Sequence, residues 1–407
     1  MLCLFEDSTV ANFLPVAATR HVGHLLAGTM TLRARALVAA NERQVTLHGR
    51  REIRDYYAAS GERVERPAGA LFVNARLPLT RAVMATFPTD PEWIVEHGGE
   101  VMAARLGAAS TQALDWEADA LDFSTLSHVP RHELHEGNPY TYLWDLLFDN
   151  GRWIVDDFGR DRLTRQGEVM DGAHLVNASA VAIGAGSVVK PGAVIDAGAG
   201  PVIIGEEVEI MPNAVIEGPC YIGDHCRVKI GAKIYGHTSI GPWCKVGGEV
   251  ENSIILGYSN KQHDGFLGHS YLGHWVNLGA DTNTSDLKNN YGHVRVTIEG
   301  REIDSGRMFL GALIGDHAKT SINTMLNTGT VVGVGANIFG SGFPPKEIPP
   351  FAWGGSTGQR YRIDDAVAVA GLVMQRRSIT MTSADEALLR RIYAAGGSAL
   401  SSGSLPA

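Results

Sequence analysis

Aliphatic side chains recur at every sixth position through the middle of the chain. From Ile204 to Val246, eight consecutive sixth positions all hold isoleucine or valine. The same period runs upstream from Ile183 to Ile195. It returns downstream at Phe266, Leu272 and Leu278, and again at Ile314, Thr320, Leu326, Val332 and Ile338. A period of six fits neither a helix nor simple alternation, and predicts short strands joined by tight turns.

This six-residue repeat predicts a parallel β-helix, in which one aliphatic side chain per strand points inward. Glycine often follows the aliphatic residue, and it supplies the positive φ angles that the corners need. Three repeats make one coil, so Cys226 and Cys244 should stack as small buried fillers. The repeat slips between Val246 and Phe266, so we expect residues 249–265 to include a loop outside the regular coil.

The chain on either side of the repeats has a different pattern of hydrophobic and polar residues. Residues 1–170 mix helical and strand-like patterns around a buried strand at 71–77, which predicts an α/β domain. We place the β-helix at residues 174–345. Residues 346–407 should hold an exit strap, helices and a mobile tail. Within this last part, Ser383 and Glu386 have the spacing of a capping box, with the Ser383 hydroxyl bonding the Glu386 amide.

Composition and charge exclude several classes of protein. The chain has 48 glycines among 407 residues, 44% apolar and 19% charged residues, which fits neither disorder nor a helical bundle. A net charge of -9 argues against nucleic acid as a partner. Four cysteines without a CxxC motif predict neither a zinc ribbon nor disulfides. The longest apolar run, 366–374, is too short for a membrane helix, so we expect a cytoplasmic protein without a membrane partner.

Two segments carry a resemblance to a known family. They are Leu4-Phe5-Glu6-Asp7 and Gly257-Tyr258-Ser259-Asn260-Lys261-Gln262-His263-Asp264-Gly265-Phe266-Leu267-Gly268. Together with the repeats, they resemble the sugar-1-phosphate nucleotidyltransferases with β-helix tails. This group includes the bifunctional N-acetylglucosamine-1-phosphate uridylyltransferases/glucosamine-1-phosphate N-acetyltransferases. The resemblance implies a nucleotidyltransferase-like α/β domain, a left-handed parallel β-helix, C-terminal helices and a homotrimer.

The resemblance also implies a nucleotidyl-transfer site in the first domain, using an NTP, a sugar 1-phosphate and Mg²⁺. Arg20, Arg33 and Arg76 would then contact phosphate. The sequence departs from the family at two places. Glu6-Asp7-Ser8 stands where the family has a glycine-rich phosphate loop, and Asn74-Ala75-Arg76 lacks the aspartate that holds Mg²⁺. The alternative is a structural or regulatory relic, with these arginines as ordinary surface residues.

In the β-helix the resemblance implies acetyl transfer from acetyl-CoA to an amino sugar 1-phosphate. His263 would be the general base, because an imidazole titrates near cellular pH. Asn277 would orient the substrate, while Ala280 and Ile322 fall at the positions that meet the acetyl group and acyl-CoA. The expected substrate contacts are Lys261, Phe266, Lys288, Asn290 and Tyr291, with Lys233 and Lys245 as replacements for the family's phosphate-binding residues.

Three other interpretations compete with catalysis. The polar cluster around His263 could serve corner hydrogen bonding alone. His263, His269, His274 and His293 could bind a metal, but no carboxylate spacing supports this, so we expect no metal site. The whole chain could be a sugar-nucleotide sensor or an assembly subunit, which the missing phosphate loop favours for the first domain.

Overall fold

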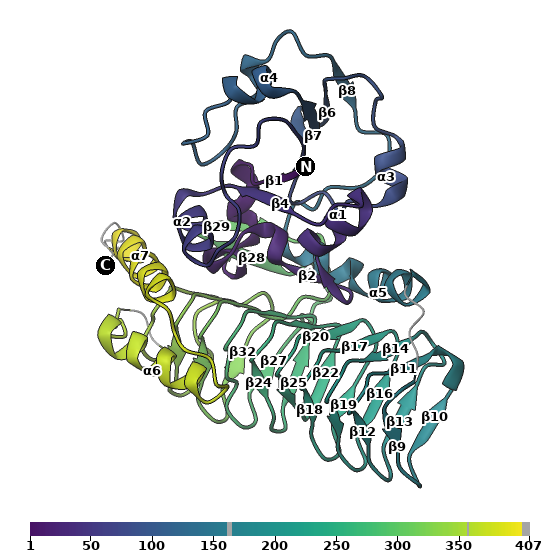
Figure 1. Cartoon of the computed structure of the whole chain (residues 1–407). Coiled ribbons are helices and arrows are strands. Elements are labelled where there is room, and N and C mark those ends of the chain that lie inside the picture. The colour runs from purple at the N-terminus through teal and green to yellow at the C-terminus, as the bar shows by residue number, and fades with distance from the viewer. Residues whose placement is uncertain (161–164, 356–357, 401–407) are drawn as a thin grey trace.

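The computed structural model describes residues 1–160, 165–355 and 358–400, with side chains through residue 396. Residues 401–407, the end of the expected mobile tail, lie outside this range. The chain forms an amino-terminal α/β domain, a left-handed β-helix and a carboxy-terminal helix pair (Figure 1). No described helix is long and apolar enough to cross a membrane.

The amino-terminal domain is built on a mixed sheet with the order β4-β1-β5-β7-β6-β8. Its strands are β1 (Leu2–Phe5), β4 (Val45–His48), β5 (Ala70–Asn74), β6 (Trp93–His97), β7 (Glu100–Leu106) and β8 (Arg131–Glu133). Its helices include α1 (Leu32–Ala40), α2 (Arg51–Ala59), α3 (Arg81–Ala85) and α4 (Ala108–Ala113). β1 runs parallel to both β4 and β5. The chain passes from β1 to β4 on one side and then to β5 on the other, so the topological switch point lies between the ends of β1 and β5.

Short elements connect β1 to α1 and continue after β7. They are η1 (Ser8–Phe13), η2 (Val16–Thr19), η3 (Val22–His24), the hairpin β2 (Leu26–Ala27) and β3 (Met30–Thr31), and later η4 (Phe123–Thr125). The long helix α5 (Leu143–Arg160) ends the domain and lies along the β-helix (Figure 1). The alternation of helix and strand predicted for this region is confirmed.

The β-helix has three faces, which follow one another around each coil. Face 1 contains β11 (Val181–Ile183), β14 (Val202–Ile204), β17 (Cys220–Ile222), β20 (Thr238–Ile240), β23 (Ile254–Ile255), β26 (Tyr271–Leu272), β30 (Leu313–Ile314), β33 (Val331–Val332) and β35 (Glu347–Ile348). Face 2 contains β9 (Glu168–Val169), β12 (Val188–Val189), β15 (Glu209–Ile210), β18 (Arg227–Val228), β21 (Lys245–Val246), β24 (Asn260–Lys261), β31 (Lys319–Thr320) and β34 (Asn337–Ile338). Face 3 contains β10 (His174–Val176), β13 (Val194–Asp196), β16 (Val215–Glu217), β19 (Lys233–Ile234), β22 (Glu249–Glu251), β25 (Phe266–Gly268), β27 (Asn283–Thr284) and β32 (Met325–Leu326).

The sixth-position aliphatic residues fill the interior of the β-helix, as predicted. The eight positions from Ile204 to Val246 belong to one buried cluster. Each strand pairs in parallel with its equivalent one coil away; Val228, for example, pairs with Val246. Cys226 and Cys244 are buried free thiols on consecutive coils. Because no single strand can bury its inner face alone, the coils stabilise one another.

The loop expected at residues 249–265 does not exist. This segment forms β22, β23 and β24 within the regular coil. The repeat slips because two corners are shorter there, and because Lys261 takes the interior position that pairs with Val246. The interior residue of the next strand is Leu267 and not Phe266. The pattern was missed because a lysine occupies an aliphatic position.

The chain does leave the coil between β27 and β30. There it forms the antiparallel hairpin β28 (Arg295–Ile298) and β29 (Arg301–Asp304). Val294, Val296 and Ile298 of this excursion are buried in a cluster shared with the amino-terminal domain. We name residues 285–312 the excursion; the sequence analysis did not predict its hairpin.

The outer side of face 1 packs against the amino-terminal domain. Ile254, Tyr271, Leu313 and Val331 point outward from four successive strands and share a buried cluster with Leu25. In the same interface, the Tyr271 hydroxyl donates a hydrogen bond of 2.9 Å to the Leu26 carbonyl. The two parts therefore share one continuous apolar interface.

The carboxy-terminal helices lie beside the last coils (Figure 1). They are α6 (Ile363–Gln375) and α7 (Ser383–Leu400). The capping box is one residue earlier than predicted: the Asp385 N–H bonds Thr382 Oγ1 at 3.2 Å, and the Thr382 N–H bonds the Asp385 carboxylate at 2.8 Å. The Arg391 guanidinium lies 2.9 Å from Asp55 on α2. α7 also runs four residues past Gly396, where the tail was expected to begin.

Candidate functional site

Two buried ion pairs occupy the ends of β1 and β5, where open α/β sheets bind their ligands. Glu6 Oε2 lies 3.1 Å from Arg50 Nε. Asp7 accepts hydrogen bonds from Asn74 Nδ2 at 2.7 Å and from Arg76 Nε at 2.8 Å. Burial alone would raise the pKa of both carboxyls, but the charges of Arg50 and Arg76 hold each pKa below its usual range. Both carboxylates are therefore ionised and neutralised within the chain.

These carboxylates do not fit a Mg²⁺ site. Asp7 Oδ1 accepts from the Thr9 N–H at 2.9 Å, and its other oxygen is already bonded. Both oxygens of Glu6 contact Arg50, at 3.1 and 3.2 Å. Among the residues that the structure describes, no group of three or more acidic, histidine or cysteine side chains is placed to hold a metal. Mg²⁺ needs free oxygen ligands, which this arrangement does not offer.

The three arginines expected to contact phosphate do not converge. Arg20 forms a buried ion pair with Asp316 of the β-helix. Arg33 pairs with Glu62 at 2.9 Å, and Arg76 pairs with Asp7 at 2.8 Å. Arg20 and Arg76 are buried, so they are not ordinary surface residues either. The sequence identified the right residue type but not the carboxylate that neutralises each arginine.

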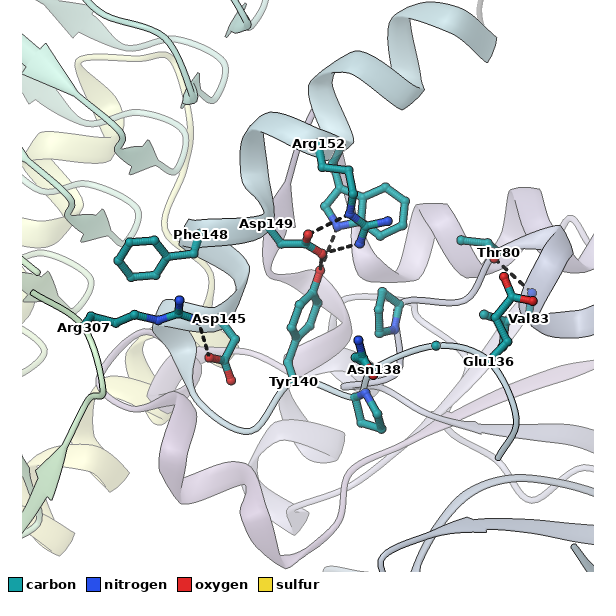
Figure 2. Close-up of a pocket in the computed structure, with 14 residues that line it drawn as sticks. Thr80, Val83, Glu136, Asn138, Tyr140, Asp145, Phe148, Asp149, Arg152 and Arg307 are labelled. Carbon is teal, nitrogen blue, oxygen red and sulfur yellow. Dashed lines mark hydrogen bonds and ion pairs between the residues drawn. The ribbon is translucent and has the colours of Figure 1, made fainter. Parts of the chain in front are cut away.

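A cavity of about 580 Å³ opens just beyond the end of β5 (Figure 2). In it, the Tyr140 hydroxyl donates to Asp149 at 2.6 Å and accepts from Trp153 Nε1 at 2.7 Å. Arg152 Nε also bonds Asp149, at 2.7 Å. Burial and the adjacent Asp149 charge raise the pKa of Tyr140, so its hydroxyl stays protonated. This network fixes one wall of the cavity on α5.

The β-helix contributes an arginine to the same cavity. Arg307 of the excursion lies with its guanidinium 4.4 Å above the Phe148 ring and 3.9 Å from Asp145 (Figure 2). Arg152 and Arg307 are both substantially exposed, but each lies beside a carboxylate of the same wall, Asp149 and Asp145, so their charges are balanced within the chain. None of these residues was predicted from the sequence. The only signal was the Asp149–Arg152 spacing of three on a helix, which is common on surface helices.

In the β-helix, three of the residues expected at the acetyl-transfer site lie along the edge between faces 2 and 3. His263 is exposed in the corner between β24 and β25. The corner of the next coil stacks on it, since the Asp281 N–H bonds the Asp264 carbonyl at 3.0 Å. The coil after that continues the stack through the Asn323 N–H and the Ala280 carbonyl, 2.8 Å apart. His263, Ala280 and Ile322 therefore lie on three successive corners, about 5 Å apart per coil.

Lys261 lies beneath this edge and not on it. Its side chain is 1% exposed, so it does not reach the surface that a substrate would contact. Its Nζ donates to the His263 carbonyl at 2.6 Å and to the Gly247 carbonyl at 3.1 Å. Burial lowers the pKa of Lys261 to about 8. The expected substrate contact is thus an internal support for the corner that carries His263.

The remaining predicted residues divide between two faces and a second edge. Asn277 is exposed on face 2, 3.4 Å from the Asn260 amide. Lys245 lies on the same face, where burial and then Arg377 lower its pKa. On face 3, Lys233 pairs with Glu249 at 3.6 Å, and Phe266 is the next residue in that row.

Lys288, Asn290 and Tyr291 lie in the excursion, which leaves from the edge between faces 3 and 1. Tyr291 is 65% exposed. One face spans about six residues, or roughly 20 Å at the rise of an extended strand. Within one chain, the structure therefore does not bring this group together with His263.

Comparisons with known proteins agree with this architecture. Residues 2–166 match the family model described as sugar nucleotidyl transferase, and residues 201–229 match bacterial transferase hexapeptide (six repeats). The chain is 37% identical over 91 residues to the bifunctional sugar-1-phosphate nucleotidylyltransferase/acetyltransferase of Sulfurisphaera tokodaii, covering 22% of this chain and 23% of that protein. It is 37% identical over 93 residues to the bifunctional protein GlmU of Methanococcus vannielii, covering 22% of each.

The chain thus aligns with less than a quarter of the length of these relatives. A crystal structure of a putative acetyltransferase from Bacillus cereus aligns with 57% of this chain and 93% of that one, at 13% identity and a TM-score of 0.20, which carries no argument. The two family matches confirm the resemblance found in the sequence. The chain joins an amino-terminal α/β domain similar to the sugar nucleotidyl transferases to a hexapeptide-repeat β-helix.

Proposed function

We propose that this chain transfers the acetyl group of acetyl-CoA to the amino group of a sugar 1-phosphate, at the edge between faces 2 and 3. The observation that carries the proposal is the stack of His263, Ala280 and Ile322 on consecutive corners, with His263 exposed and its carbonyl held by Lys261. A corner that served packing alone would not need a buried lysine beneath an exposed imidazole. The names of the relatives, which include acetyltransferase, agree with this chemistry.

His263 is the general base in this proposal. The nucleophile is the neutral sugar amine: its nitrogen attacks the thioester carbonyl, the imidazole takes the proton that this nitrogen loses, and it then gives the proton to the leaving sulfur. A C–N bond forms, the C–S bond breaks, and coenzyme A leaves as a thiol. The backbone at Ala280, one coil away, lies close to where the acetyl group must sit. Asn277 presents its amide to the substrate from face 2.

The proposed site is completed by a second copy of the chain in a homotrimer. Lys288, Asn290 and Tyr291 lie across face 3 from His263, so they would reach a bound sugar phosphate only from a neighbouring subunit. Face 1 is covered by the amino-terminal domain. Neighbouring copies would therefore contact each other through faces 2 and 3, which lie between His263 and the excursion.

For the amino-terminal domain we propose binding of a sugar phosphate or nucleotide in the cavity of Figure 2. The place of the cavity beyond the end of β5 supports this proposal; a phosphate there would bind Arg152 and Arg307 in competition with Asp149 and Asp145. Nucleotidyl transfer is the alternative that the family match at residues 2–166 raises, but the bonded strand-end carboxylates favour binding without transfer. Because the strand-end carboxylates are bonded to Arg50 and Arg76, we route no step through Mg²⁺.

The direct experiment measures thiol release from acetyl-CoA with glucosamine 1-phosphate or galactosamine 1-phosphate as acceptor. We expect release that depends on the sugar and falls at least 100-fold in His263→Ala, in line with the usual contribution of a general base. His225→Ala is the matched control, because His225 is also exposed in a corner but on a different edge. Equal rates in wild type and His263→Ala would contradict the assignment of the base.

A further inference from the structure

Four cationic side chains gather on the half of face 2 that borders the edge between faces 1 and 2. Arg227 and Lys245 point outward from neighbouring strands, β18 and β21, where they pair in register. Arg376 and Arg377 come from the turn that follows α6. Arg377 Nη2 donates a hydrogen bond of 2.9 Å to Asn260 Oδ1, and Asn260 is the partner of Lys245 on the next strand. We name Arg227, Lys245, Arg376 and Arg377 the cationic cluster.

The positive charge of the cationic cluster is not balanced within the chain. Arg227 pairs with Glu209 at 2.5 Å, and Glu209 is shared with a further lysine of face 2. Within the described part of the chain, no carboxylate lies at ion-pair distance from Lys245, Arg376 or Arg377. Burial and then the Arg377 charge lower the pKa of Lys245. Like charges held this close destabilise the folded chain unless an anion binds between them.

The cationic cluster is accessible to a ligand from outside the β-helix. The side chain of Arg227 is 50% exposed, Arg376 is exposed, and Lys245 and Arg377 are half-buried. The chain as a whole carries a net charge of -9, so a local excess of cations is not a consequence of its composition. Guanidinium groups bind phosphate oxygens through paired N–H donors. The cluster therefore favours a ligand with more than one phosphate.

The cationic cluster and His263 lie at opposite sides of face 2. The coil that carries His263 enters this face at Tyr258, passes Asn260 beneath Arg377, and reaches His263 after Gln262. From Tyr258 to His263 it runs five residues, or roughly 16 Å at the rise of an extended strand. The pantetheine arm that separates the thioester of acetyl-CoA from its phosphates has a similar extended length. One acetyl-CoA lying across face 2 therefore brings its thioester to His263 and its phosphates to the cluster.

The phosphate of the sugar acceptor fits this place poorly. In glucosamine 1-phosphate the amino group and the phosphate are attached to neighbouring ring carbons. A sugar whose amine lies at His263 therefore keeps its phosphate at the same edge, and does not reach Lys245 or Arg377 on the far half of face 2. Lys245 was expected to contact the sugar phosphate, but its position suits the donor better.

We propose that the cationic cluster binds the phosphates at the nucleotide end of acetyl-CoA, with the pantetheine arm crossing face 2 along β24. This inference rests on the proposed acetyl transfer. It gives the terminal helices a part in donor binding, because Arg376 and Arg377 follow directly on α6. Arg377 also holds the Asn260 amide, which donates to Asn277 at 3.4 Å. The donor site is therefore joined to the residue expected to orient the substrate.

The test titrates adenosine 3′,5′-bisphosphate into the full-length chain by calorimetry. This probe has phosphates but no thioester, so its binding is measured without turnover. We expect saturable binding that weakens as salt is added. Arg377→Met and Lys245→Met should each weaken it at least tenfold, which is the usual effect of losing a hydrogen bond to a charged group. In the acetyl-transfer assay, both variants should raise KM for acetyl-CoA at least tenfold and leave KM for the sugar unchanged.

Lys190→Met is the matched control, because Lys190 lies on the same face three coils before Lys245 and is paired with Glu209. It should bind the bisphosphate as the wild type does.

Two results separate this inference from the proposed function. Bisphosphate binding that depends on Arg377, without sugar-dependent thiol release, would support the phosphate site and contradict acetyl transfer. Sugar-dependent turnover with the same KM for acetyl-CoA in wild type and Arg377→Met would overturn the phosphate site alone. So would equal affinity for the bisphosphate in the wild type and both variants. A changed oligomeric state with unchanged affinity would also overturn it, and would show that the cationic cluster pairs with carboxylates of a neighbouring copy.

Discussion

Replacing Lys261 with methionine tests the part of the structure that supports His263. Lys261 fills an interior position that aliphatic residues fill in neighbouring coils, and its ammonium contacts the Gly247 and His263 carbonyls. Methionine has a similar length, suits the apolar interior and cannot donate these hydrogen bonds. We therefore expect Lys261→Met to fold with its coil intact while its His263 corner loses its internal support.

The stability effect has a definite pH signature. Burial lowers the pKa of Lys261 from 10.5 to about 8, a change that corresponds to about 3 kcal/mol. Below pH 8 Lys261 is charged in both the folded and the unfolded chain. Burial of this charge then lowers the free energy of unfolding by the full amount, about 3 kcal/mol. Between pH 8 and 10.5 Lys261 is neutral in the folded chain but still charged in the unfolded chain, so the folded state no longer holds a buried charge. The wild type should therefore gain about 3 kcal/mol of unfolding free energy relative to Lys261→Met across that range.

The assay combines denaturant unfolding at pH 7 to 10.5 with acetyl-CoA turnover at pH 7. We expect kcat to fall at least tenfold in Lys261→Met. The reason is that His263 is displaced from the reacting atoms, which slows the reaction even though the variant is folded. Lys229→Met, on the same edge two coils earlier, is the control and should show neither effect. A pH-independent stability difference, or full turnover in Lys261→Met, would refute the assignment of Lys261 as a positioning residue.

Two further predictions concern the amino-terminal domain. Arg35→Met breaks a buried pair in which Nη1 and Nη2 lie 2.9 and 3.1 Å from Asp157, and should lower the unfolding free energy by about 3–5 kcal/mol in denaturant titrations; an unchanged midpoint would contradict this. With UTP, Mg²⁺ and a sugar 1-phosphate, we expect ligand binding without pyrophosphate release, because the strand-end carboxylates are already bonded. Pyrophosphate release that Asp7→Asn abolishes would show that the domain catalyses nucleotidyl transfer.

The sequence predicted the β-helix well because its constraint is local and periodic. Every strand of a coil needs an aliphatic side chain at its inward position. The same residue type therefore recurs at eight positions from Ile204 to Val246. The prediction failed where Lys261 broke the pattern, since residue type alone does not show that an ammonium can be satisfied by two carbonyls. The capping box moved by one residue for a similar reason: Thr382 and Ser383 are both good capping residues, and tertiary packing selected Thr382.

The candidate sites were harder to predict because they depend on contacts between distant segments. Arg20 and Asp316 are 296 residues apart, and Arg307 reaches the cavity of Figure 2 from an excursion that has no repeat. No periodicity links such pairs. The edge with His263, Ala280 and Ile322 could be anticipated because the coil repeat itself brings these residues into line.

Chemical rescue of the His263 variant shows whether the imidazole of His263 is the base for acetyl transfer. Sugar-dependent thiol release from acetyl-CoA is measured for wild type and His263→Ala, with and without added imidazole, after confirming equal oligomeric states. The account predicts a loss of at least 100-fold in the variant and partial recovery with imidazole, since only the missing base is replaced. Sugar-dependent release that is unchanged in His263→Ala would contradict it.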